Sequence, residues 1–231
     1  HALSTRLRTP KIASSADVPH KGRDTMTCPD LHRTFALMLL PAALLLSACE
    51  KVSSPPAFHA TEIREASFGR ELRLPDTEGR VRTLADFRGE VVGVYFGFLQ
   101  CPDVCPTALS RAVEVKRLLG EEGKRFRIVF VTVDPERDTP EVVRAYLDAF
   151  DPSFVGLVGS PEEVARTAKE FRVYYRKVPT GSSYTMDHTA TTFVYNADGK
   201  LRLAVPHALP AEAFAADVRR LLAEAPAAPG R

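Results

Sequence analysis

The chain has 231 residues, with 31 Lys and Arg against 29 Asp and Glu, and 45% of its residues are hydrophobic. This balance excludes the strongly basic footprint of a nucleic-acid-binding protein, and the hydrophobic content is sufficient for a packed core. Residues 1–48 hold six of the basic and three of the acidic residues, so the rest of the chain is also close to neutral. We therefore expect a globular domain that does not bind nucleic acid.

The amino-terminal part predicts export and anchoring. Residues 1–25 begin without Met and lack apolar periodicity, so we interpret them as an upstream extension outside the fold. Residues 26–48 include twelve mostly apolar residues, too few to span a bilayer as a helix. They resemble a bacterial lipoprotein signal peptide, whose cleavage would leave Cys49 as the lipid-bearing terminus. An ordinary secretory signal and an uncleaved anchor are the alternatives. The expected location is extracytoplasmic, on the bacterial inner membrane and facing the periplasm.

The chain after Cys49 divides into three parts. Residues 49–66 contain Ser53-Ser54-Pro55-Pro56 and predict an extended tether. Residues 67–224 have the length and apolar content of one domain. Residues 225–231 predict a frayed tail.

Hydrophobic runs and turn residues predict the elements of this domain. The run Val91–Phe98 is continuously apolar, which indicates a central strand buried on both faces. In chain order we expect a hairpin over 71–84, strand 91–98, helix 107–119, strand 127–133, helix 139–150, strand 154–158, a helix from Ser160, a strand hairpin over 191–205 and helix 211–223. This order is thioredoxin-like, so the predicted class is α/β, a thioredoxin-like fold with an added N-terminal β-hairpin.

Two cysteines, Cys101 and Cys105, follow the predicted central strand. The carboxyl ends of such strands are where open α/β sheets place their sites. A cysteine pair at a helix start favours reactivity, because the helix N-terminus stabilises a thiolate and lowers its pKa. The thiolate serves disulfide exchange and metal binding alike, so the spacing leaves both open. A structural disulfide is the third alternative in an oxidising compartment.

His188 is the candidate third ligand. It precedes the predicted strand at 191–195, and in a thioredoxin-like topology the loop entering that strand faces the cysteine loop. Dithiol oxidoreductases usually place a proline there, and this sequence has none from His188 to Tyr195. Two thiolates suit Cu(I), and an added imidazole makes a site that also holds Cu(II). The missing proline therefore favours metal binding over general disulfide exchange, with Cys101, Cys105 and His188 as the candidate ligands for copper.

Other polar residues near these motifs have structural interpretations. Asp134 and Asp138 combine with neighbouring prolines in the chemistry of a turn and a helix cap, so we expect them to keep their loop rigid. Asp187 is a candidate to orient the adjacent histidine by accepting from its second ring nitrogen. His59 and His207 are expected to lie outside the site, and the alternative for either is a weak fourth ligand.

Three motifs, in this order, resemble the Sco/SenC family of copper chaperones. They are Gly97-Phe98-x-x-Cys101-Pro102-Asp103-Val104-Cys105-Pro106, Val133-Asp134-Pro135-Glu136-Arg137-Asp138-Thr139-Pro140 and Tyr184-x-x-Asp187-His188. The resemblance covers about Phe68 to Leu222. It implies a thioredoxin-like fold, one copper ion on the two cysteines and the histidine, and a role in assembling the dinuclear copper centre of cytochrome c oxidase. Leu99-Gln100 departs from the family, which often has Thr followed by an aromatic residue or His.

The expected function is that of a membrane-anchored copper chaperone for this oxidase centre. The expected partners are the oxidase subunit that carries the centre, and a periplasmic thiol reductant or second copper chaperone. Two alternatives stay open: a thiol-disulfide oxidoreductase that reduces the centre's cysteines with Cys101 and Cys105 as its redox-active pair, and a redox sensor. A peroxidase is disfavoured, because neither cysteine has Thr three residues before it. Whether the protein is an enzyme is therefore undecided by sequence.

Overall fold

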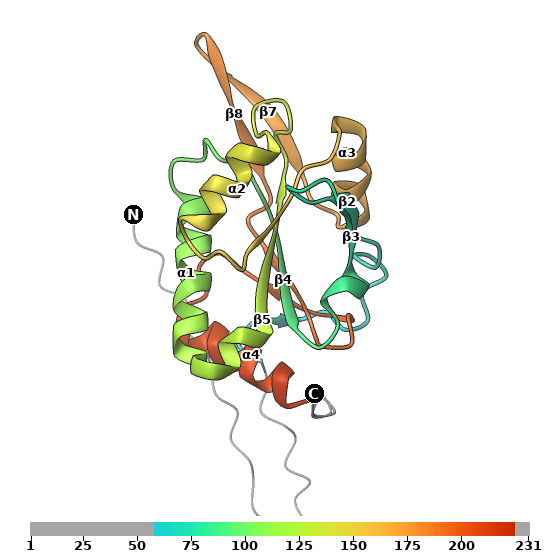
Figure 1. Ribbon diagram of the computed structural model, residues 1–231, viewed down its shortest axis with the longest axis vertical. Coiled ribbons are helices and arrows are strands. Elements are labelled where there is room, and N and C mark those ends of the chain that lie inside the picture. The colour runs from blue at the N-terminus through green and yellow to red at the C-terminus, as the bar shows by residue number, and fades with distance from the viewer. Residues whose placement is uncertain (1–57, 225–231) are drawn as a thin grey trace, which may run out of the picture. The chain divides into compact units, whose positions relative to one another are not determined.

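A six-stranded mixed sheet forms the centre of the protein, and the computed structural model describes residues 58–224 (Figure 1). In order across the sheet, the strands are β1 (Thr61–Glu62), β10 (Leu201–Val205), β9 (Thr192–Tyr195), β4 (Val91–Gly97), β5 (Phe126–Thr132) and β6 (Val155–Leu157). The strands β1, β10 and β9 are antiparallel to their neighbours, and β4, β5 and β6 are parallel to one another. The predictions for residues 1–48, including the signal peptide, for Cys49 and for the tail 225–231 lie outside the described residues.

Helices cover both faces of this sheet. They are α1 (Val104–Leu119), α2 (Pro140–Asp148), α3 (Pro161–Glu170) and α4 (Ala211–Ala223), with short 3-10 helices η1 (Leu84–Phe87) and η2 (Gly120–Arg125). Figure 1 shows α1 and α2 along one side of the strands, and α3 with the hairpin of β2 (Arg73–Pro75) and β3 (Val81–Thr83) on the other. The predicted thioredoxin-like fold with an added hairpin is confirmed.

The local sequence explains where these elements lie. All seven residues of β4 are buried, because helices and the β2–β3 hairpin cover the sheet on both sides. Both α2 and α3 begin with a proline in the first turn, where the missing N–H costs nothing. Ser160 and Glu163 form the capping box that starts α3. No helix within residues 58–224 has the length and apolar character needed to cross a membrane.

The amino-terminal end of the described chain is docked on the domain. Thr61–Glu62 pair with β10 although they lie in the segment 49–66 that the sequence predicts as a tether. The carboxylate of Asp217, fully buried in α4, accepts from the backbone N–H groups of His59 and Ala60 and lies 2.9 Å from the His59 Nδ1 atom. The folded part therefore starts earlier than the predicted residue 67, and His59 has a structural role.

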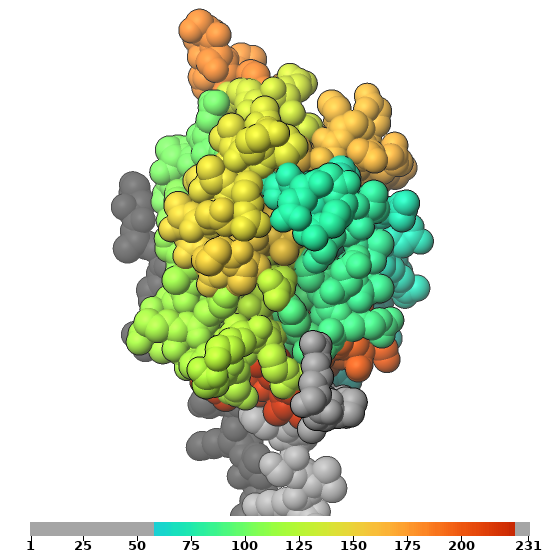
Figure 2. Space-filling model, in the orientation of Figure 1, coloured from blue at the N-terminus to red at the C-terminus, as the bar shows by residue number. Residues whose placement is uncertain are grey.

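A second hairpin, absent from the sequence prediction, lies between α3 and β9. It consists of β7 (Tyr175–Thr180) and β8 (Ser183–His188), joined by a turn in which Gly181 has φ +60°. Most of its side chains are exposed or half-buried, so the hydrophobic signal that predicts a strand is weak here. The sequence signal that could have predicted this hairpin is the turn at Gly181 between the two strand segments. This hairpin projects beyond the sheet at the end where the cysteine loop lies (Figures 1 and 2).

Candidate metal site

Three elements bring the predicted ligands together. Cys101 lies in the loop after β4, Cys105 is the second residue of α1, and His188 is the last residue of β8. The helix begins at Val104, three residues before the predicted Thr107, so Cys105 belongs to its first turn. Pro106 stands beside it in this turn, where a proline is tolerated.

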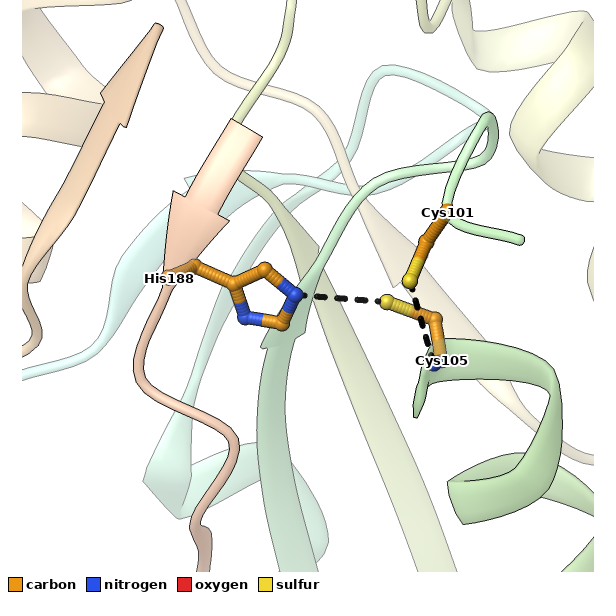
Figure 3. Close-up of side chains that lie close together, drawn as sticks. All are labelled: Cys101, Cys105 and His188. Atoms are coloured by element: carbon orange, nitrogen blue, oxygen red, sulfur yellow. Dashed lines mark hydrogen bonds between the residues drawn. The ribbon is translucent and has the colours of Figure 1, made fainter. Parts of the chain in front are cut away.

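The donor atoms of these three residues form one cluster. The Cys101 Sγ, Cys105 Sγ and a ring nitrogen of His188 all lie within 4.8 Å of one another. The Cys105 Sγ is 3.5 Å from the His188 Nε2, and the Cys105 backbone N–H donates to the Cys101 Sγ at 3.4 Å. Figure 3 shows the imidazole pointing at the Cys105 sulfur. Among residues 58–224, these three form the one group of His, Cys, Asp or Glu side chains that has metal-binding geometry. His59 and His207 are not part of this group.

The histidine is held in the form that a metal requires. Its Nδ1 lies 3.1 Å from the Thr189 carbonyl oxygen, which only accepts, so Nδ1 carries the proton and the Nε2 lone pair faces the sulfurs. The rings of Phe98 and Tyr95 pack edge-on against the imidazole, with centroids 5.7 and 6.2 Å away. Burial lowers the pKa of His188, which keeps the ring neutral at neutral pH.

Burial also controls the chemistry of Cys105. The side chain is fully buried and accepts from the Tyr95 hydroxyl at 3.8 Å. Loss of hydration, together with the smaller effect of the nearby Cys101, raises the pKa of the Cys105 thiol to about 12. The expectation that the helix N-terminus lowers the pKa is therefore wrong for Cys105. Both cysteines are free thiols, and Cys101 is the more exposed of the two.

The acidic residues have structural partners. The Asp138 carboxylate accepts from the Leu99 N–H and the Thr132 hydroxyl, and Asp134 accepts from Arg137 and Tyr184. These bonds agree with the predicted loop-stabilising role.

Asp187 does not orient His188. Its carboxylate accepts from Arg176 at 3.2 Å on the exposed side of the hairpin. Neighbouring residues on a strand point to opposite faces, which is why adjacency in sequence misleads here.

In the reduced protein, we expect iodoacetamide at pH 8 to modify Cys101 well before Cys105. A pKa near 12 leaves about a thousandfold less thiolate than the ordinary value of 9.0, and burial blocks the reagent as well. Peptide mapping by mass spectrometry at successive times measures the order. The difference should vanish in denaturant. Equal rates in the native protein would contradict a buried, protonated Cys105.

Comparison with known proteins adds independent information. The SCO1/SenC family model matches residues 60–223. The "Protein SCO2 homolog, mitochondrial" of Bos taurus is 37% identical over 189 residues, which are 80% of this chain and 71% of the relative. A structure of Bradyrhizobium japonicum ScoI with copper bound is 39% identical with a TM-score of 0.61, and the match covers 68% of this chain and 99% of that one. Apo Sco1 from Thermus thermophilus is 38% identical with a TM-score of 0.63, covering 71% and 97%.

The matched residues span nearly all of the described domain and include both cysteines and the histidine. The TM-scores of 0.61 and 0.63 show that the fold is similar to that of the solved relatives. This protein belongs to the SCO1/SenC family.

Proposed function

We propose that this protein is a copper chaperone that binds one copper ion, Cu(I) or Cu(II), through Cys101, Cys105 and His188 and delivers it to the dinuclear copper centre of cytochrome c oxidase. The observation that carries the proposal is the convergence of two thiols and one imidazole within 4.8 Å. The solved relative from Bradyrhizobium japonicum contains copper, and this chain is 39% identical to it.

The donor set fits copper in chemistry and in size. Thiolates are soft ligands that suit Cu(I), and imidazole suits both oxidation states. Three metal bonds of about 2.0–2.3 Å place their donor atoms roughly 3.5–4 Å apart, so the observed cluster needs only small side-chain movements to close on an ion. Binding displaces the proton of the Cys105 thiol, since the metal takes the thiolate form.

The site is also open to a partner. A hollow of about 500 Å³ leads to Cys101 and His188, and Pro102, Tyr174 and Thr185 form part of its wall. An open hollow lets a partner's ligands reach the ion and exchange with those of this protein.

Redox state should control binding. Oxidation of the two cysteines to a disulfide removes both thiolates, so the oxidised protein loses its affinity for copper. A chaperone with this property needs reduced cysteines. This requirement supports the proposed partnership with a periplasmic thiol reductant or a second copper chaperone, beside the oxidase subunit that accepts the ion.

Anchoring at the membrane completes the proposal. The sequence Leu46-Ser47-Ala48-Cys49 supports lipid attachment at Cys49 and a position on the periplasmic side of the inner membrane. An anchored carrier stays near a membrane-embedded oxidase.

A strain that lacks this protein tests the function. We expect low cytochrome c oxidase activity that rises when copper is added to the medium. The wild-type gene should restore activity, whereas Cys101→Ser and His188→Ala should not, because each removes a proposed ligand. His59→Ala is the matched control, since its ring bonds to Asp217 and lies outside the cluster. Normal oxidase activity in the deletion strain, with only regulation altered, would instead support a redox sensor.

The free, partly exposed Cys101 beside a second thiol favours a thiol-disulfide reductase as the second candidate function. The dithiol would attack a disulfide of the oxidase centre, pass two electrons and two protons to it, and end as the Cys101–Cys105 disulfide. This reaction needs no imidazole ligand. A His188→Ala variant that restores oxidase activity, together with inactive cysteine variants, would favour the reductase over the chaperone.

A further inference from the structure

The β7–β8 hairpin carries His188 but is a small, exposed appendage. It forms a two-stranded sheet of its own and projects beyond the central sheet (Figure 1). A two-stranded hairpin is at best marginally stable in water. The contacts that tie it to the domain therefore decide where the imidazole lies.

One guanidinium links the hairpin to two loops of the domain. Arg137 lies in the loop between β5 and α2, and its Nη1 donates to the backbone carbonyl oxygen of Tyr184 at 2.8 Å and to the side-chain oxygen of Gln100 at 2.9 Å. Its Nε donates to the carboxylate of Asp134. The guanidinium carbon also lies 3.7 Å from the centroid of the Tyr184 ring, within cation–π range. A single side chain thus contacts the hairpin, the cysteine loop and its own loop.

Tyr184 closes the connection on the hairpin side. Its hydroxyl donates to the other Asp134 oxygen at 2.8 Å, and Asp134 is 1% exposed. Lys177 of β7 pairs with Glu136 at 2.5 Å and lies 4.8 Å from the centre of the same ring. The loop that follows β5 therefore contacts both strands of the hairpin.

The position of Tyr184 is coupled to that of His188. The two residues are four apart on β8, so their side chains lie on the same face of the strand. Fixing Tyr184 against Asp134 and Arg137 fixes the face of the strand that presents the imidazole to the cysteines.

From this geometry we propose that Arg137 is a positioning residue for the metal site, which holds the β7–β8 hairpin where His188 can join Cys101 and Cys105. The inference rests on the proposed copper site. Arg137 does not contact the ion in this proposal; it acts by positioning His188.

A double-mutant cycle in copper affinity tests this coupling. We expect Arg137→Ala to weaken Cu(II) binding about 10- to 100-fold, the usual range for residues that orient a ligand. In a His188→Ala background the same substitution should change affinity less than twofold. Arg176→Ala is the matched control, because this arginine lies on the same hairpin and makes an exposed ion pair that contributes little.

Hydrogen exchange in the metal-free protein gives a second readout. Arg137→Ala should speed amide exchange in the β7–β8 hairpin at least tenfold and leave β4 and β5 unchanged. If Arg137→Ala does not fold, Tyr184→Phe removes only the hydroxyl bond to Asp134 and should show the same pattern with a smaller amplitude.

The outcomes separate this inference from the proposed function. An equal loss of affinity with and without His188 would overturn the inference, because Arg137 would then act through Gln100 and the cysteine loop. Unchanged hairpin exchange would overturn it as well. A wild-type protein that fails to bind copper would defeat the proposed function, while the exchange experiment would still report on the attachment of the hairpin.

Discussion

Replacement of Cys105 by serine is expected to abolish copper binding by the reduced protein, with a loss of affinity on the order of a thousandfold or more. Loss of a residue that only orients a ligand lowers metal affinity about 10- to 100-fold, and loss of the ligand itself lowers the affinity more. A serine hydroxyl stays protonated at neutral pH and is a hard donor, so it does not replace a thiolate on Cu(I). Titration with Cu(I) against a competing chelator under reducing conditions measures the effect.

The companion variants make this prediction specific. Cys101→Ser should lose binding to a similar extent, and His188→Ala should weaken it strongly. His59→Ala should bind copper as the wild type does, because His59 pairs with Asp217 away from the cluster. Circular dichroism of each variant checks that it is folded. Unchanged affinity in all three site variants would defeat the proposed metal site.

Gly97→Ala is expected to damage the site from within the core. A Cβ atom on Gly97 would lie 2.9 Å from the Cys105 Sγ, 2.8 Å from the Phe130 Cε2 and 3.0 Å from the Tyr95 Cε1. Distances this short force the surrounding atoms to shift, and the Cys105 Sγ is one of the two that lie below 3.0 Å. Overpacking of this kind costs about 1–3 kcal/mol of stability. Displacement of a ligand sulfur should lower copper affinity roughly tenfold or more, since metal sites tolerate errors of about 0.2 Å.

Gly93→Ala provides the matched control for this prediction. Gly93 lies in the same strand, and its Cβ would meet the Ile128 Cδ1 at 2.9 Å and the Thr192 Cγ2 at 3.0 Å. We expect a similar loss of stability in urea unfolding, with normal copper affinity in the folded protein. If Gly97→Ala bound copper normally, the glycine would serve packing alone and not the position of Cys105.

Much of the fold follows from local sequence. The continuous apolar run at 91–98 predicted β4 because a strand buried on both faces shows no polar alternation. Prolines at the start of α2 and α3 marked both helices, since proline fits the first turn and no other. The β7–β8 hairpin escaped prediction because most of its side chains are exposed or half-buried, which leaves little hydrophobic periodicity.

The sequence by itself determined the family, the order of the central strands and the four helices, and the identity of the three candidate ligands, because residue types and spacings carry that information directly. Only the tertiary structure decided that His188 meets Cys105 across 83 positions of sequence, and that burial raises the pKa of Cys105 where the helix start alone would lower it. It also replaced Asp187 with the Thr189 carbonyl as the partner of the imidazole. Distance in space, strand facing and solvent exclusion arise from packing of the whole domain, and short stretches of sequence do not encode them.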